Sequence, residues 1–125
     1  ALKDGTIDMV TSDHHPLNSE LKYVELDLAH FGSIGLEHSF GCLLSMFDVA
    51  IVVDILTRGK ARFGITASPI QEGATADVSL FTPDGKKTVT KADIKSTSKN
   101  SLFMDQALPG KVFGVIAQNK VRLAE

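Results

Sequence analysis

The sequence has very little cysteine: Cys42 is the single one among 125 residues, beside four histidines. That count excludes a disulfide framework and a zinc site built from cysteines. Cys42 lies within an apolar stretch, where a packed core position is the ordinary role and a nucleophile is the alternative. A lone thiol also fits a reducing compartment, so we expect a cytoplasmic protein.

An excess of one charge is also lacking, because 13 basic residues face 15 acidic residues and the net charge is −2. Without a basic surplus we expect no nucleic-acid partner. The most apolar region, residues 42–56, is short and contains Asp48 and Asp54, so we expect no membrane span. The opening letters ALKDGTID have neither the basic start nor the apolar run of a signal peptide.

What is present resembles the composition of a folded globular domain. Hydrophobic residues make up 43% and charged residues 22%, which excludes wholesale disorder. The length is that of one ordinary domain. Because the chain has no initiator methionine and opens in a pattern typical of the end of a helix, we expect it to be part of a longer protein.

The first half of the chain has an α/β pattern. Residues 6–12 (TIDMVTS) are apolar on both faces and predict a buried parallel strand. Apolar residues at three-to-four spacing predict a helix over residues 36–47. A second helix is expected from about Asp48, its N-cap, to residue 57, and a short third turn over residues 60–63.

The second half predicts β-structure. Strands are expected over residues 76–81, 86–89, 112–117 and 120–123. Pro83, Asp84 and Gly85 predict a turn between the first two strands, and Gln118-Asn119 predicts a hairpin between the last two. The polar residues 91–101 predict a surface loop.

The candidate site is the run Ser12-Asp13-His14-His15-Pro16, directly after the first predicted strand. Active sites of α/β folds lie at the C-terminal ends of parallel strands. Asp13 is suited to bind a divalent metal and to accept a proton from metal-bound water, and a histidine could complete the metal shell or orient a substrate. A solvated turn with a capping aspartate is the alternative, because three metal ligands are normal and this chain does not supply them.

Two further histidines have different settings. His38 lies among apolar helix positions, which favours a structural role over a catalytic one. His30 lies in the long loop over residues 18–31, before Phe31-Gly32, where glycine lets a backbone approach a ligand closely.

Several motifs, in order along the chain, resemble the dihydroorotases of the cyclic amidohydrolase superfamily. Residues 5–8 (GTID), leading into TSDHHP, resemble the last barrel strand of that family. Residues 29–32 (AHFG) resemble its APFG, and residues 35–37 (GLE) its GLET. Residues 72–78 (EGATADV) resemble EGADADLV, and residues 98–103 (SKNSLF) resemble SKNTPF. Together the motifs cover essentially the whole chain.

The resemblance implies a fold and an activity. The fold class would be α/β: the C-terminal segment of a metal-dependent amidohydrolase β/α barrel, plus part of the attached β-sandwich. Residues 1–64 would supply the last strand, active-site loop and C-terminal helices of the barrel, and residues 65–125 the sandwich. The family interconverts dihydroorotate and carbamoyl-aspartate in pyrimidine synthesis with one or two Zn²⁺ ions. Most of its metal ligands would lie outside this chain, so we expect the chain alone to be inactive.

The resemblance also implies site residues. Asp13 falls on the aspartate that is both metal ligand and catalytic base, while His15, Phe31 and Gly32 fall on positions that line the substrate. Leu17 departs from the family, because it stands where a substrate-binding histidine is expected and it cannot hydrogen-bond a carboxylate.

The departure at Leu17 keeps two alternatives open. One is a non-catalytic dihydroorotase-like subunit that supports aspartate transcarbamoylase, and the other is a related allantoinase or hydantoinase. The implied partners are the small-molecule substrate, the N-terminal part of the same protein and a second copy in a homodimer. Without that N-terminal part, we expect the chain to be unstable or to self-associate.

Overall fold

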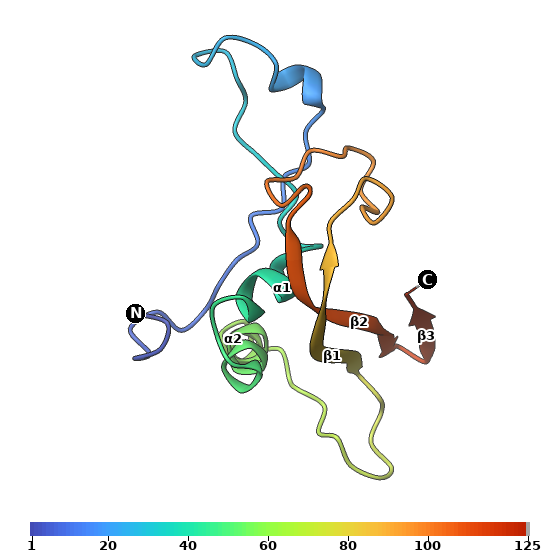
Figure 1. Ribbon diagram of the computed structural model, residues 1–125. Coiled ribbons are helices and arrows are strands. Elements are labelled where there is room, and N and C mark those ends of the chain that lie inside the picture. The colour runs from blue at the N-terminus through green and yellow to red at the C-terminus, as the bar shows by residue number, and fades with distance from the viewer. Residues whose placement is uncertain (125) are drawn as a thin grey trace.

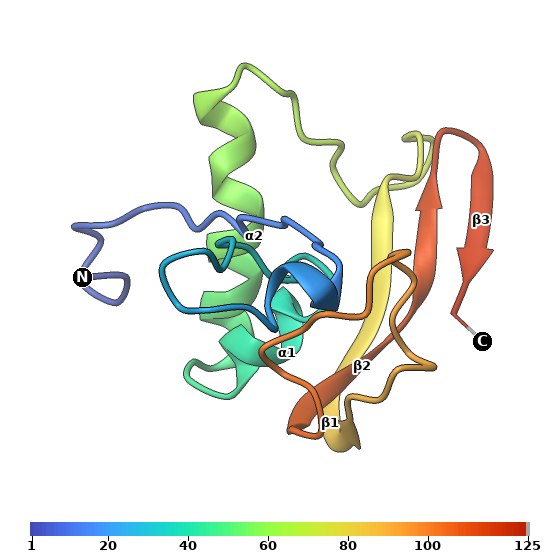
Figure 2. The ribbon, with the colours of Figure 1, turned by 90° about the horizontal axis from the view of Figure 1, so that it is seen from above.

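The computed structural model describes residues 1–124. In chain order it contains a short 3-10 turn, η1 (Ser19–Leu21), the helices α1 (Ser39–Leu44) and α2 (Val49–Arg62), and the strands β1 (Val78–Thr88), β2 (Ala107–Ala117) and β3 (Lys120–Leu123). The strands form one antiparallel sheet in the order β1-β2-β3. Figure 1 and Figure 2 show both helices on one side of this sheet, with β3 at its far edge. The fold is therefore a small α/β structure.

Residues 6–12 do not form the predicted strand. They run as irregular chain, and Ile7, Met9 and Val10 are at least one-third exposed. Within residues 1–124 no strand lies beside this segment, so its backbone groups have no ladder to join. The prediction of a buried parallel strand is wrong for this chain, because a strand of that kind needs neighbours on both sides.

The helices differ from the prediction mainly in length. Helix α1 covers only the middle of the expected residues 36–47. Helix α2 begins after Asp48 as predicted but continues to Arg62, and so includes the expected third turn. Gly59 lies inside this helix, and the Met9 sulfur packs 2.9 Å from where a Cβ on Gly59 would lie. The helix instead ends before Gly64, whose φ of 66° suits the left-handed position after a helix.

The predicted closing hairpin is confirmed, and the predicted turn at residues 83–85 lies inside a strand. Gln118 and Asn119 both have positive φ, 51° and 59°, which is the geometry of a tight two-residue hairpin turn. In β1, Thr82 pairs with Lys111 and Lys86 with Pro109, so extra residues of β1 bulge between these pairs. The two short strands expected here are therefore one irregular strand.

The core joins the helices to the sheet. Leu43 of α1 packs with Val52 and Ile55 of α2, and all three side chains are buried. The Phe40 ring of α1 meets Phe81 of β1 edge to face, with ring centroids 4.8 Å apart. A second set of buried side chains comes from the loops and the sheet end: Ile34, Val89 and Ile94. Within residues 1–124, no helix has the length and apolar character needed to cross a bilayer.

Two neighbouring valines of α2 test this core. Val52 is 0% exposed and Val53 is 38% exposed. We expect Val52→Ala to lower the free energy of unfolding by about 2 kcal/mol, because it removes buried methyl groups and leaves a cavity. Val53→Ala is the matched control and should change it by less than about 0.5 kcal/mol. Chemical denaturation measures both, and equal effects would contradict the assigned core.

An apolar groove of about 590 Å³ lies on the helical side of the protein and gives a physical reason to expect self-association. Its lining includes Met9, Val10, Leu36, Met46, Leu56 and Phe63. Because exposed apolar surface of this kind drives association, we expect the 125-residue chain to associate with increasing concentration in sedimentation velocity. Met46→Lys should weaken the association, whereas Tyr23→Lys, outside the groove, should not. A chain that stays monomeric at every concentration would contradict the expectation.

Candidate functional site

Asp13 is an exposed residue that directly follows the irregular residues 6–12. Its φ is 43°, in the left-handed region that non-glycine residues seldom occupy, although aspartate tolerates it better than most. Its backbone N–H donates to the Thr11 hydroxyl oxygen at 3.4 Å. Asp105, Gln118 and Asn119 share a positive φ, so this backbone position does not by itself distinguish Asp13 as a site residue.

Residues 12–17, which include Asp13, lie beside residues 32–35, which include Gly32. These two stretches are called the site segments below. The His15 N–H donates to the Ser33 carbonyl oxygen at 3.0 Å. A Cβ on Gly32 would lie 2.8 Å from the His15 carbonyl oxygen, and one on Gly35 would collide with the Ser12 carbonyl oxygen. Only glycine allows backbones to approach this closely. The structure therefore brings the two predicted site segments together.

Phe31 extends from the edge of this pair of segments. Its side chain is 96% exposed and contributes nothing to the core. The loop over residues 18–31 projects away from the helices and the sheet, as Figure 1 shows. It is closed internally by the His30 N–H, which donates to the Leu21 carbonyl at 3.2 Å, and by Lys22 Nζ, which donates to the His30 carbonyl. Phe31 thus lies at the exposed base of a closed loop.

His14 points into the protein rather than toward a ligand. Its Nδ1 accepts the Leu36 N–H at 3.2 Å, and its Nε2 lies 3.3 Å from the Ser96 hydroxyl oxygen. The Ser96 hydroxyl in turn donates to Glu37 Oε1. With Nδ1 as acceptor, a neutral ring carries its proton on Nε2 and donates it to Ser96. Both ring nitrogens are therefore used in holding the segment, and His14 is not available to complete a metal shell.

Glu37 accepts three hydrogen bonds from the loop over residues 91–101. Besides the Ser96 hydroxyl, the N–H groups of Lys95 and Ser96 donate to its carboxylate at 2.6 and 3.0 Å. Partial burial raises the pKa of Glu37, but the hydrogen bonds from Ser96 and Lys95 outweigh it, and the pKa is lowered overall. The carboxylate thus binds residues 95–96 to the start of the helical region.

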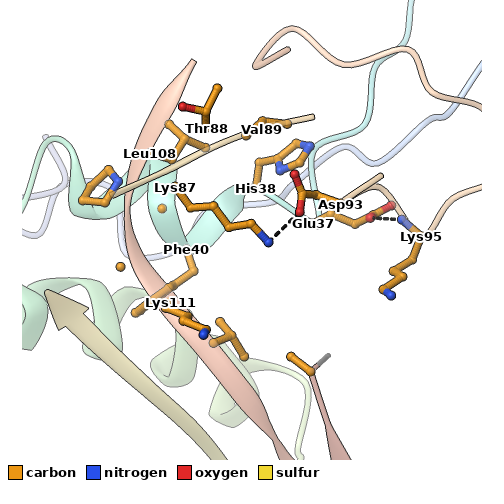
Figure 3. Close-up of a pocket in the computed structure, with 15 residues that line it drawn as sticks. Glu37, His38, Phe40, Lys87, Thr88, Val89, Asp93, Lys95, Leu108 and Lys111 are labelled. Carbon is orange, nitrogen blue, oxygen red and sulfur yellow. Dashed lines mark hydrogen bonds and ion pairs between the residues drawn. The ribbon is translucent and has the colours of Figure 1, made fainter. Parts of the chain in front are cut away.

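A cavity of about 400 Å³ lies between α1, β2 and this loop (Figure 3). Lys87 reaches across it to Asp93, with an Nζ–Oδ1 distance of 2.5 Å. The bond from Lys87, with bonds from Thr90, holds the pKa of Asp93 far below its usual range. None of Asp13, His15, Phe31 or Gly32 lines this cavity. It is therefore separate from the predicted site.

His38 has the structural setting that its apolar neighbours predict. It is buried, and its ring meets Phe103 edge to face with centroids 5.8 Å apart. Burial lowers the pKa of His38, and the negative charges of Glu37 and Asp93 oppose this only in part. The ring is accordingly neutral at pH 7 and packs as a core residue.

The described residues do not assemble a metal centre by themselves. Across residues 1–124, no group of three or more His, Cys, Asp or Glu side chains is placed to hold a metal ion. Asp13 offers one carboxylate, whereas zinc sites in proteins take at least three protein ligands. The expected Zn²⁺ therefore does not fit this chain alone.

The sequence missed the contribution of residues 91–101, which were expected to be an ordinary surface loop. Ile94 is buried, and Ser96, Ser98 and Asn100 all form hydrogen bonds with the two site segments. The one sequence signal for this was the resemblance of residues 98–103 to SKNTPF. Polar composition alone could not reveal it, because these bonds cross from one half of the chain to the other.

The lowered pKa of Glu37 gives a pH dependence. The hydrogen bonds to its carboxylate contribute stability above its ordinary pKa of 4.5, and this is lost as the pH falls through the lowered value in the folded chain. We expect Glu37→Gln to lower the thermal midpoint at pH 7 and to flatten its fall in acid. Glu72→Gln, in an exposed loop, is the control. Identical acid profiles for wild type and Glu37→Gln would contradict the assignment.

Known proteins resemble this chain over nearly its whole length. No family model matches it. It is 33% identical over 127 residues to the dihydroorotase of Caldanaerobacter subterraneus subsp. tengcongensis, covering 97% of this chain and 30% of that protein. It is 35% identical over 127 residues to the dihydroorotase of Pelotomaculum thermopropionicum, covering 96% of this chain and 30% of that protein.

Solved structures give the same result for the fold. The chain superimposes on a D-hydantoinase (dihydropyrimidinase) from Thermus sp. with a TM-score of 0.76 and 24% identity, covering 98% of this chain and 30% of that one. The chain thus spans about 30% of the length of the relatives that it matches. The ordered motifs and the sequence identity agree, and the chain belongs to the amidohydrolase family, whose dihydroorotases it matches over nearly its own length.

Proposed function

We propose that this chain is part of a dihydroorotase-type hydrolase that interconverts dihydroorotate and carbamoyl-aspartate by opening and closing a ring amide. The observation that carries the proposal is the side-by-side contact of the two site segments, which places the exposed His15 against Gly32, with the exposed Asp13 two residues before His15. The family identity makes this reading specific. In the whole protein, residues 1–64 would complete a β/α barrel and residues 65–125 an attached β-sandwich.

The exposed groups of the two segments suit a cyclic amide with a carboxylate. The Asp13 carboxylate is available to accept a proton from an attacking water molecule. The Leu17 side chain cannot form a hydrogen bond with a substrate carboxylate. Its Cδ1 lies 3.1 Å from where a Cβ on Gly32 would be. The exposed His15 ring is then the hydrogen-bond donor that this segment offers to the substrate. Phe31 and the Gly32 backbone would cover the ring.

Zn²⁺ is a proposal for the whole protein only. Asp13 would be one of its ligands, and the others would come from outside residues 1–124, as the family resemblance implies. The N-terminal part of the same protein is thus the first partner, and a homodimer the assembly we propose.

A non-catalytic subunit that supports aspartate transcarbamoylase is the second candidate. Leu17 favours it, because an apolar side chain occupies the place of an expected substrate ligand and is packed against Gly32. An allantoinase or hydantoinase activity is a further alternative within the same superfamily. The fold likeness to the D-hydantoinase does not choose between these substrates.

Removal of the Asp13 carboxylate in the full encoded protein tests the proposal. We expect Asp13→Ala to lower kcat for both dihydroorotate hydrolysis and carbamoyl-aspartate cyclisation by at least about 100-fold, because the general base is lost. Asp84→Ala, in the irregular part of β1, is the control and should retain the wild-type rate.

The outcomes separate the candidates. A wild-type rate in Asp13→Ala would reject the assigned role of Asp13. A wild-type protein that opens hydantoin or allantoin but not dihydroorotate would favour the related enzymes. A protein inactive on all three rings that co-purifies with aspartate transcarbamoylase would favour the supporting subunit.

A further inference from the structure

The polar segment over residues 94–102, here called the clamp segment, lies across both site segments (Figure 1). It belongs to the connection between β1 and β2, far along the chain from Asp13. Ile94 anchors one end in the interior. Lys99 Nζ donates to the carbonyl oxygens of Ile94 and Ser96 at 2.7 and 2.9 Å, and so ties the segment to itself. The clamp segment is therefore an ordered loop with its own internal bonds.

Asn100 holds the segment that carries Gly32. Its Nδ2 donates to the Gly32 carbonyl oxygen at 3.2 Å, and its own carbonyl oxygen accepts the Ile34 N–H at 3.1 Å. The Leu102 N–H donates to the Ser33 hydroxyl oxygen at 3.1 Å. Three successive residues are thus bound to the clamp segment, and the last of them, Ile34, is fully buried.

Ser98 holds the segment that carries Asp13. Its hydroxyl donates to the Leu17 carbonyl oxygen, in a partly buried position. The Leu17 side chain packs against Gly32, so this hydrogen bond also helps to hold the two site segments together. Together with the bond between Ser96 and His14, it fixes the segment on both sides of His15.

We propose that Ser98 and Asn100 are positioning residues for the candidate site. Their side chains bind the carbonyl groups of Leu17 and Gly32, and through these set the place of His15 relative to Phe31. The role in positioning is independent of any activity, whereas its catalytic consequence rests on the proposed function. The clamp segment comes from the β half of the chain and the site from the α/β half, so the two halves depend on each other.

Matched variants in the full encoded protein test the clamp. Ser98→Ala removes the hydroxyl, and Asn100→Asp keeps the shape but replaces the Nδ2 donor by an oxygen facing the Gly32 carbonyl. Ser101→Ala is the control, because within residues 1–124 the hydroxyl oxygen of Ser101 accepts the Phe103 N–H of the same loop and bonds to neither site segment. In hydrogen exchange, we expect peptides containing His15 and Ile34 to exchange about fivefold faster or more in the first two variants only.

Hydrogen exchange in the peptide that covers α2 distinguishes local release of the site segments from global unfolding of the protein. Faster exchange at His15 and Ile34, with α2 unchanged, supports the clamp. Unchanged exchange at His15 and Ile34, or equal acceleration in α2, would overturn it. Both results are independent of whether the protein hydrolyses dihydroorotate.

Kinetics test the catalytic consequence. Ser98→Ala and Asn100→Asp should lower kcat for dihydroorotate about tenfold or more with KM within about twofold, since displaced groups bind substrate but align it poorly. Ser98→Thr keeps the hydroxyl and should restore the rate, and Ser101→Ala should leave it unchanged. Wild-type kcat in both clamp variants would overturn the catalytic consequence. Wild-type protein without dihydroorotase activity would instead reject the proposed function, with the exchange result still deciding the clamp.

Discussion

The close backbone contact between residues 12–17 and residues 32–35 is the constraint on which the rest of the candidate site depends. Gly32 and Gly35 permit it, because a Cβ at either position would collide with a carbonyl oxygen of the opposite segment. It turns two stretches separated by a long loop into neighbours. His15 consequently lies beside Gly32 without sharing a helix or a strand with it.

Hydrogen bonds from the second half of the chain maintain this contact. The Glu37 carboxylate accepts bonds from Lys95 and Ser96, and Asn100 bonds to the Gly32 carbonyl. The bond from Asn100 is partly buried, so removing its donor would leave the Gly32 carbonyl oxygen without that partner at a cost in free energy. Loops of the β half of the chain therefore hold loops of the α/β half in place.

Local signals predicted the elements whose interactions are local. The hairpin at Gln118-Asn119 depends on two adjacent residues with positive φ, and the start of α2 follows Asp48, the expected N-cap. The strand expected over residues 6–12 depends on neighbouring strands that residues 1–124 do not contain, and its apolar side chains are exposed accordingly. The same reasoning applies to the proposed zinc site, because Asp13 would be one ligand and residues 1–124 place no group of three His, Cys, Asp or Glu side chains around a metal.

The sequence by itself determined the family, through ordered short motifs, and with it Asp13, His15, Phe31 and Gly32 as the residues to examine. The tertiary structure decided which of their neighbours hold them: His14 turned inward to Ser96, Leu17 packed on Gly32, and the polar clamp segment laid across both. Motifs record which side chains occur in order along one chain. Hydrogen bonds between residues more than 60 positions apart arise only when the folded backbone brings a donor and an acceptor within reach.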